Sequence, residues 1–194
     1  VLRLLPDLSG LDTSFNGTGV VNYVGTATGM ATGYSITIQD DQKILVSGSE
    51  VTGLPVDVKP DVLVLRYMPN GALDKSFAKN GVFIYQNPSG DFPAYGNNIE
   101  MQADGKIVVA GSISSATQTR AMVMRLDAGG TLDSSMGTNG VVLYQGSGNY
   151  EYAYDVAIQP DGKIVLAAAS GNGAVTDAAV IRFLGNGSLD ASFG

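Results

Sequence analysis

A repeat of about 60 residues constrains the fold of this chain more than any other sequence feature. The motif Leu-Asp-x-Ser-Phe, with Met for Phe in one copy, occurs four times, and its aspartates are Asp12, Asp74, Asp133 and Asp190. A Gly-Val-x-x-Tyr segment follows each of the first three copies, and the segment Asp-Gly-Lys-Ile or a close variant comes next. A repeat of this length indicates that one supersecondary unit is built several times.

The motifs set the boundaries of the units. Residues 11–72, 73–131 and 132–188 are three full repeats, residues 1–10 are the end of a preceding repeat, and residues 189–194 start a following one. We expect each repeat to form one blade-like unit.

The third repeat shows the strand pattern most clearly. Residues 140–144 are a β-branched run, and residues 154–159 alternate, with Tyr154, Val156 and Ile158 predicted on one face. Pro160 to Lys163 predicts a tight hairpin turn, because Pro presets φ and Gly accepts a positive φ. Residues 164–168 and 178–183 follow as two more strands.

Four short antiparallel strands in each repeat predict an all-β fold made of β-propeller blades. A β-solenoid is the alternative, but its period is normally near 20 residues. Propellers close with about four to eight blades, so three repeats form an open fan or part of a larger ring. The sheet edges and apolar blade faces exposed by an isolated unit would favour aggregation. Two copies could complete a six-bladed ring, or head-to-tail contacts could build a filament.

The combination of Leu-Asp-x-Ser-Phe-Gly, Asp-Gly-Lys-Ile and a late arginine resembles the delta-60 repeat family over essentially the whole chain. The sequence departs from the pattern in places: Gln42 replaces Gly, Met136 replaces Phe, and Asn16 and Ala78 replace the Gly after Phe. The resemblance implies propeller-type repeats and an extracellular or cell-surface setting in bacteria. It implies no reaction and no ligand.

Composition excludes several classes of chemistry. The chain contains no Cys and no His, so it has no thiolate nucleophile, disulfide, imidazole base or imidazole metal ligand. Its formal net charge of −7, without a basic run, argues against nucleic acid as a partner. No apolar run approaches the roughly 18 residues of a membrane-spanning helix. We expect no cofactor, no metal and no membrane insertion.

An arginine near the end of every full repeat is followed eight residues later by an aspartate. The pairs are Arg66 and Asp74, Arg125 and Asp133, and Arg182 and Asp190. They could form a ring of ligand-binding charges, but a device present in every repeat is better explained as structural. We therefore expect each Asp to cap the following turn or to pair with its Arg.

The segments that do not repeat are better candidates for ligand binding. Residues 86–97 and 145–153 are rich in aromatic and polar side chains. The candidate residues are Asn87, Asp91, Phe92, Tyr95, Asn149, Tyr150, Glu151 and Tyr152. Such side chains on a rigid β scaffold suit stacking and hydrogen bonding to a glycan or a protein. Packing between blades is the alternative explanation.

These observations favour a non-enzymatic interaction scaffold, extracellular or on the cell surface, that binds protein, glycan or further repeats through variable loops. A self-assembling fibre or coat subunit is one alternative. A polysaccharide-acting hydrolase or lyase using Asp and Tyr is another, although most aspartates belong to repeated turns and only Glu50, Glu100 and Glu151 are glutamates.

Overall fold

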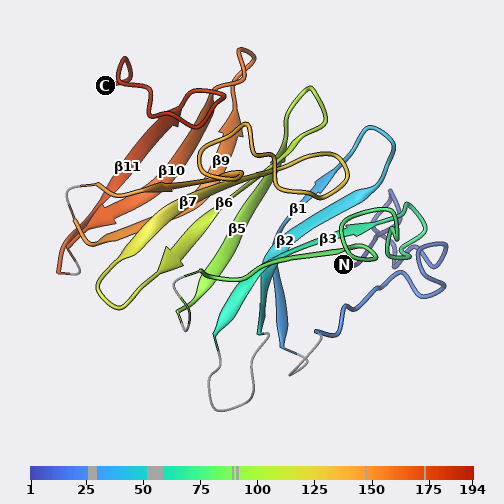
Figure 1. Cartoon of the computed structure of the whole chain (residues 1–194). Helices are drawn as coiled ribbons and strands as arrows, with labels where there is room; N and C mark the ends of the chain where they lie inside the picture. Colours follow the sequence, from blue (N-terminus) through green and yellow to red (C-terminus); the bar gives the residue numbers. More distant parts are fainter. Residues whose placement is uncertain (26–29, 52–58, 89, 91, 147, 173) are drawn as a thin grey trace.

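The computed structural model of the chain is an open fan of antiparallel β-sheets (Figure 1). It describes residues 1–25, 30–51, 59–88, 90, 92–146, 148–172 and 174–194. Within these ranges it contains strands and turns and no helix, and therefore no helix that could span a membrane.

The strands group into three blades. The first blade contains β1 (Ala31–Ile38), β2 (Ile44–Val51), β3 (Pro60–Tyr67) and β4 (Val82–Tyr85), and the second contains β5 (Ala94–Met101), β6 (Ile107–Ser114), β7 (Thr119–Leu126) and β8 (Val141–Tyr144). The third contains β9 (Tyr150–Ile158), β10 (Ile164–Gly171) and β11 (Thr176–Phe183). All pairs inside a blade are antiparallel. The prediction of an all-β chain made of such blades is confirmed, and the blades do not close into a ring.

The sheets are displaced by one strand from the sequence repeats. The Gly-Val-x-x-Tyr segment of each repeat pairs with the last strand of the preceding repeat, as β8 does with β7 and β4 does with β3. Val20 of the first such segment likewise bridges to Leu2. Each blade is therefore completed by a strand that belongs to the next repeat.

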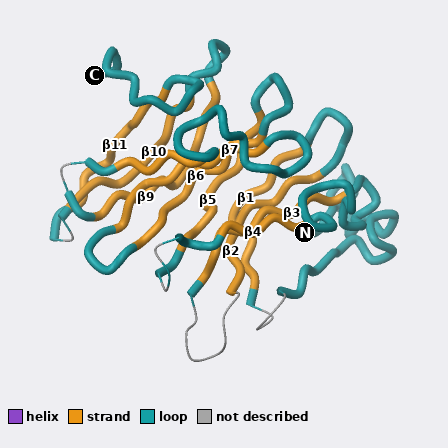
Figure 2. Tube along the Cα trace, viewed as in Figure 1, coloured by secondary structure: helices purple, strands orange, loops and turns teal. Residues whose placement is uncertain are grey.

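The first strands of the three blades lie side by side. β5 contacts both β1 and β9 and lies between them, so these three strands form the inner side of the fan (Figure 2). β4 and β8 are the outer strands of their blades and pair with β3 and β7. A single parallel bridge between Thr119 and Tyr150 links the second blade to the third.

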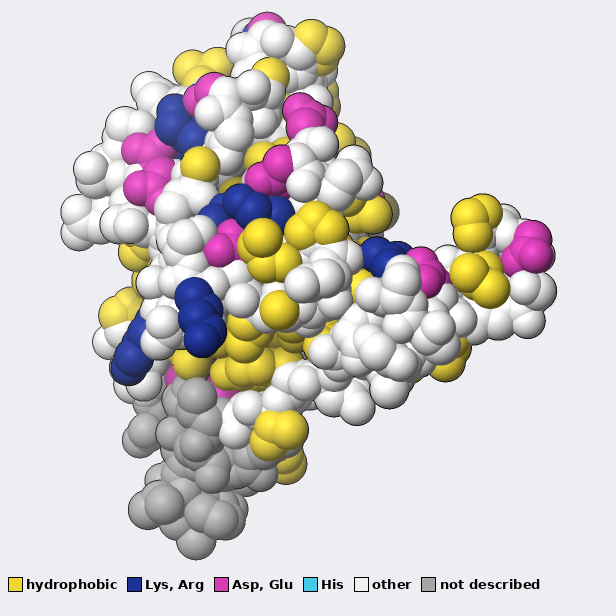
Figure 3. All heavy atoms as spheres, turned by 90° about the vertical axis from the view of Figure 1, so that its right-hand side faces the viewer, with side chains coloured by type: hydrophobic (Ala, Val, Ile, Leu, Met, Phe, Trp, Pro, Cys, Tyr) yellow, Lys and Arg dark blue, Asp and Glu magenta, His cyan; other side chains and the backbone are white. Residues whose placement is uncertain are grey.

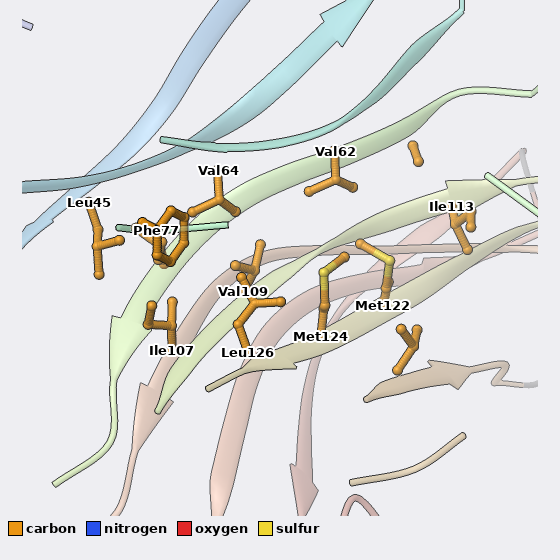
Figure 4. Close-up of a cluster of buried hydrophobic side chains, with 13 residues drawn as sticks. Leu45, Val62, Val64, Phe77, Ile107, Val109, Ile113, Met122, Met124 and Leu126 are labelled. Atoms are coloured by element: carbon orange, nitrogen blue, oxygen red, sulfur yellow. The ribbon is translucent and has the colours of Figure 1, made fainter. Parts of the chain in front are cut away.

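The hydrophobic core lies between blades rather than inside one. Figure 4 shows Leu45, Val64 and Phe77 from the first blade facing Met124 and Leu126 from the second. An equivalent cluster joins the second blade to the third, and another joins the N-terminal segment to the first blade. Because a blade buries its faces only against its neighbours, each blade depends on the next for stability.

The repeated hairpin turns require a positive φ at their third position. Gly105 and Gly162 adopt φ values of 83° and 82° there, and Gln42 adopts 66° in the first blade. The departure from glycine thus leaves the turn intact but places a side chain in the left-handed region, where it costs free energy.

Candidate functional site

A β-bulge interrupts the inner strand of every blade at the same repeat position. The pairing register shifts between Gly33 and Ser35, between Gly96 and Asn98, and opposite Ala167 and Ala168 in the third blade. The residues left unpaired are Tyr34, Asn97 and Tyr154. A bulge redirects side chains locally, and here it does so on the inner side of the fan.

The bulge corrects one prediction from the sequence. Uninterrupted alternation would place Tyr154 and Val156 together on one face, whereas Tyr154 is exposed and Val156 is buried. The buried apolar residues Ala153 and Val156 on this strand are three positions apart, because the bulge inserts an extra residue between them.

The bulges gather tyrosines on the inner strands. Tyr34 and Tyr154 are bulge residues, and Tyr95 and Tyr152 stand two positions before the bulges of β5 and β9. The Tyr34 and Tyr95 ring centroids are 6.4 Å apart, and Tyr152 and Tyr154 stack at 6.4 Å with an interplanar angle of 16°. These four tyrosines, together with Asn97, form what we call the inner tyrosine surface.

The tyrosines of this surface lie on three adjacent strands, because β5 contacts both β1 and β9. Burial raises the pKa of Tyr95, and the neighbouring phenol groups of Tyr34 and Tyr152 raise it further. The Tyr34 hydroxyl lies 3.1 Å from the Ser49 hydroxyl, and the Asn97 side-chain amide donates to the backbone oxygen of Ala153. Side chains held in this way lose little further freedom on binding a ligand.

The loop residues predicted as binding residues divide into two groups. Tyr95 and Tyr152 belong to the inner tyrosine surface, whereas Asn87 and Glu151 are buried. The Asn87 amide donates to the backbone oxygens of Phe92 and Ser114, which fixes the loop before β5.

The remaining loop residues are spread over the ends of the inner strands. Glu151 accepts hydrogen bonds from the Gly146 backbone and the Ser170 hydroxyl. Tyr150 and Asn149 are exposed where β9 begins, and the Asn149 backbone oxygen accepts from the Thr119 amide. Asp91 lies outside the described residues.

Sequence reasoning missed Tyr34 and the role of Tyr154. A signal for both existed in the alignment of the repeats, since each stands five positions before the glutamine that opens the hairpin, Gln39 or Gln159. Asn97 holds the equivalent position before Gln102.

The repeated arginine and aspartate form an ion pair in every blade. Arg66 Nε lies 2.9 Å from Asp74 Oδ2, the Arg125–Asp133 pair has the same distance, and Arg182–Asp190 has 2.8 Å. The other carboxylate oxygen of each Asp accepts from the backbone N–H and hydroxyl of the Ser two residues later. Figure 3 shows Lys or Arg groups directly beside Asp or Glu groups on one side of the molecule.

These interactions hold the aspartates in the charged form. Burial acts to raise the pKa of Asp74, but hydrogen bonds from Ser76 and the charge of Arg66 outweigh it and lower the pKa to about 2. The hydroxyl of Ser135, opposed by burial and supported by Arg125, lowers the pKa of Asp133 to about 2. Both oxygens of each of these carboxylates are therefore engaged within one blade.

A hollow lies where the three hairpin turns meet, at the ends of the inner strands. Gln39, Gln102 and Gln159 contribute to its lining. The turn aspartates each pair with the lysine two residues later, as Asp41 does with Lys43. Among the described residues, no cluster of acidic side chains could hold a metal ion.

The comparison with protein families follows the same repeats. The model of a domain of unknown function, the DUF5122 beta-propeller, matches residues 39–77, 102–135 and 159–193, which is more than half of the chain. The chain belongs to this DUF5122 beta-propeller family. A search of curated proteins finds no match.

The DUF5122 segments and the inner tyrosine surface occupy different parts of each blade. The matched segments run from the hairpin glutamine to the Leu-Asp-x-Ser motif and so contain the ion pairs. Tyr34, Tyr95, Tyr152 and Tyr154 all lie outside them. The family pattern thus describes the scaffold, and the tyrosines are features of this chain that the pattern does not include.

Proposed function

We propose that this DUF5122 chain is a non-enzymatic interaction scaffold, extracellular or on the cell surface, whose inner tyrosine surface binds a glycan. The observation that carries the proposal is the placement of Tyr34, Tyr95, Tyr152 and Tyr154 on three adjacent strands. Two of them are at β-bulges, which re-aim side chains.

The chemistry of this surface suits a sugar chain. Tyrosine rings offer apolar faces for stacking and a hydroxyl at the edge for hydrogen bonding. Asn98 and the exposed Asp155 lie on the same inner strands, each next to a bulge residue. Spacing of the tyrosines across three blades matches an extended ligand better than a small compact one.

The remaining features support a scaffold. The repeated Arg–Asp pairs engage the motif aspartates, and two of the three glutamates, Glu50 and Glu151, are buried. The resemblance to delta-60 repeats supports the bacterial surface setting.

A glycan array tests the proposal. We expect the wild-type chain to bind a defined class of polysaccharide, and the double variant Tyr152→Ala/Tyr154→Ala to lose that signal while keeping its β-sheet circular dichroism. The matched control is Lys79→Ala, an exposed side chain near the outer strand β4. Absence of any glycan signal, or equal signals from all three proteins, would contradict the proposal, and binding of a protein ligand alone would replace the glycan with a protein partner.

A further inference from the structure

One of the Asn-Gly pairs in the chain is held differently from the others. Asparagine is a thermolabile residue, and a glycine after it leaves the next backbone nitrogen unshielded by a side chain. The asparagines of these pairs are Asn16, Asn70, Asn80, Asn139, Asn172 and Asn186. Gly173 lies outside the described residues, so the pairs that can be compared are the other five.

The glycine, and not the asparagine, distinguishes the five pairs. All five asparagines are exposed. Gly71, Gly81, Gly140 and Gly187 are buried, and their N–H groups donate to backbone oxygens over 2.7–2.9 Å. Gly17 is exposed, and within the described part of the chain its N–H has no hydrogen-bond partner. The backbone nitrogen of Gly17 is therefore the accessible one.

The side chains on either side of Gly17 explain its open N–H. In the second repeat the equivalent residue, Lys79, donates its N–H to the backbone oxygen three residues later. In the first repeat that oxygen belongs to Val20, and it accepts instead from the Asn16 side-chain amide and the Thr18 hydroxyl, over 3.0 and 2.9 Å. Two side-chain bonds thus replace the backbone bond of the other repeat.

The space around Gly17 is open as well. A Cβ atom built on Gly17 would have nothing within 4 Å, whereas one on Gly187 would lie 2.5 Å from Val142 Cγ2. The exposure belongs to this position of the repeat, since Lys79, its equivalent in the second repeat, is also exposed. A ring can therefore form between residues 16 and 17 without displacing a neighbouring residue.

We propose that Asn16 is a site of spontaneous deamidation, which converts it to aspartate and isoaspartate. The backbone nitrogen of Gly17 attacks Cγ of Asn16, a C–N bond forms, and the bond from Cγ to Nδ2 breaks. The proton lost by the Gly17 nitrogen passes through water to Nδ2, which leaves as ammonia from the succinimide ring. Water then opens the ring, at Cγ to give aspartate or at the backbone carbonyl carbon to give isoaspartate.

The two products differ in their effect on the packing of the first blade. Asn16 follows Phe15, which is fully buried in the cluster between the N-terminal segment and the first blade. The Asn16 backbone N–H donates to the Asn70 oxygen over 2.8 Å. Aspartate removes the amide donor to Val20 and adds a charge, and isoaspartate in addition lengthens the backbone by a methylene group. We expect isoaspartate to loosen Phe15 more than aspartate does.

Peptide mapping by mass spectrometry, during incubation of the folded chain in warm and mildly alkaline buffer, tests the site. We expect conversion at Asn16 to be about fivefold to tenfold faster than at each of the four protected asparagines, because there the glycine hydrogen bond must first break. In concentrated urea all five glycines are free, and the rates should converge. Equal rates in the folded chain, or a difference that persists unchanged in urea, would overturn the proposal.

Variants separate the reaction from its effect on stability. Asn16→Gln keeps the amide but lengthens the side chain, so it should stop conversion at residue 16. Asn186→Gln, at a protected pair, is the matched control and should leave conversion of Asn16 unchanged. Asn16→Asp carries the charge without the longer backbone, so its melting temperature should lie between those of the unmodified chain and the chromatographically isolated isoaspartate form. An isoaspartate form that melts at or above Asn16→Asp would contradict the loosening of Phe15.

Discussion

Arg66 in β3 donates a hydrogen bond from Nη1 to the backbone oxygen of Ala128, in the turn after β7, over 2.6 Å. The same guanidinium pairs with Asp74 in its own blade and lies over the Phe77 ring. One side chain therefore connects a turn of its own blade to the next blade. Arg125 repeats the arrangement toward Gly185, so the ion pairs bind consecutive blades together as well as closing single turns.

Replacing this arginine by lysine is expected to destabilise the chain. Arg66→Lys keeps the charge but loses the planar guanidinium group that bonds to Asp74 and Ala128 at the same time. We therefore expect a loss of about 2–3 kcal/mol in unfolding free energy. Arg182→Lys is the matched control, because Arg182 lacks the contact to a next blade in the described part of the chain, and its loss should be smaller. Urea denaturation measures both, and equal losses would show that the contact between blades contributes nothing.

The hairpin turn of the first blade can be stabilised by a substitution at Gln42. Gln42 has φ 66° where the other two repeats use glycine, so Gln42→Gly is expected to stabilise the chain by about 1 kcal/mol. The reverse change, Gly105→Gln, should cost a similar amount, because space around Gly105 is open and only its φ of 83° opposes a side chain. Thermal unfolding measures both variants. A lower melting temperature for Gln42→Gly would contradict the inference that the backbone of Gln42 is strained in this turn.

Acid should weaken the ion-paired turns. The pKa of Asp74 is about 2 in the folded chain against an ordinary value of 3.8. A depressed folded pKa contributes stability that is present above the ordinary pKa and is lost as the pH falls from about 4 toward 2. We expect the urea midpoint to fall over this window, with a smaller slope in Asp74→Asn than in the wild type. Asp177→Asn, at an exposed position on β11, is the control whose slope should match the wild type.

The bulge near Tyr95 lies opposite Gly111, which leaves no room for a side chain in the second blade. A Cβ atom at Gly111 would lie 1.8 Å from the Tyr95 backbone oxygen, so Gly111→Ala must move β5 away from β6. We expect a loss of about 1–3 kcal/mol in unfolding free energy and weaker glycan binding. The third blade has Ala168 at this position. Ala168→Gly is the control variant. It should lower the unfolding free energy by under about 1 kcal/mol and leave glycan binding at Tyr95 unchanged.

The fold was predictable because its determinants recur. Asp74, Asp133 and Asp190 sit in identical turns, and each hairpin repeats its turn residues, so three copies of one local pattern specified the blades. The assignment of strands to sheets was harder to predict, because the pairing of β8 with β7 joins residues from two different repeats.

The candidate site was predictable only in part. Tyr95 and Tyr152 stood out as aromatic residues in variable segments, but Tyr34 and Tyr154 are placed by β-bulges. A bulge interrupts the two-residue alternation of side chains on which strand prediction depends, and no residue pattern within one repeat predicts the bulge. Asn87 and Glu151 looked like loop-surface residues and are buried, since their amide and carboxylate groups find backbone and hydroxyl partners inside the fold.

Calorimetric titration with the glycan class selected on the array tests the central claim most directly. Tyr95 lies on β5, the middle one of the three adjacent inner strands, so Tyr95→Ala is expected to weaken binding about tenfold, because a ring contact of this kind is worth about 0.5–1.5 kcal/mol. Tyr95→Phe keeps the ring and should stay within about threefold of the wild type. An unchanged dissociation constant for Tyr95→Ala, with its fold intact, would contradict a glycan site on the inner tyrosine surface.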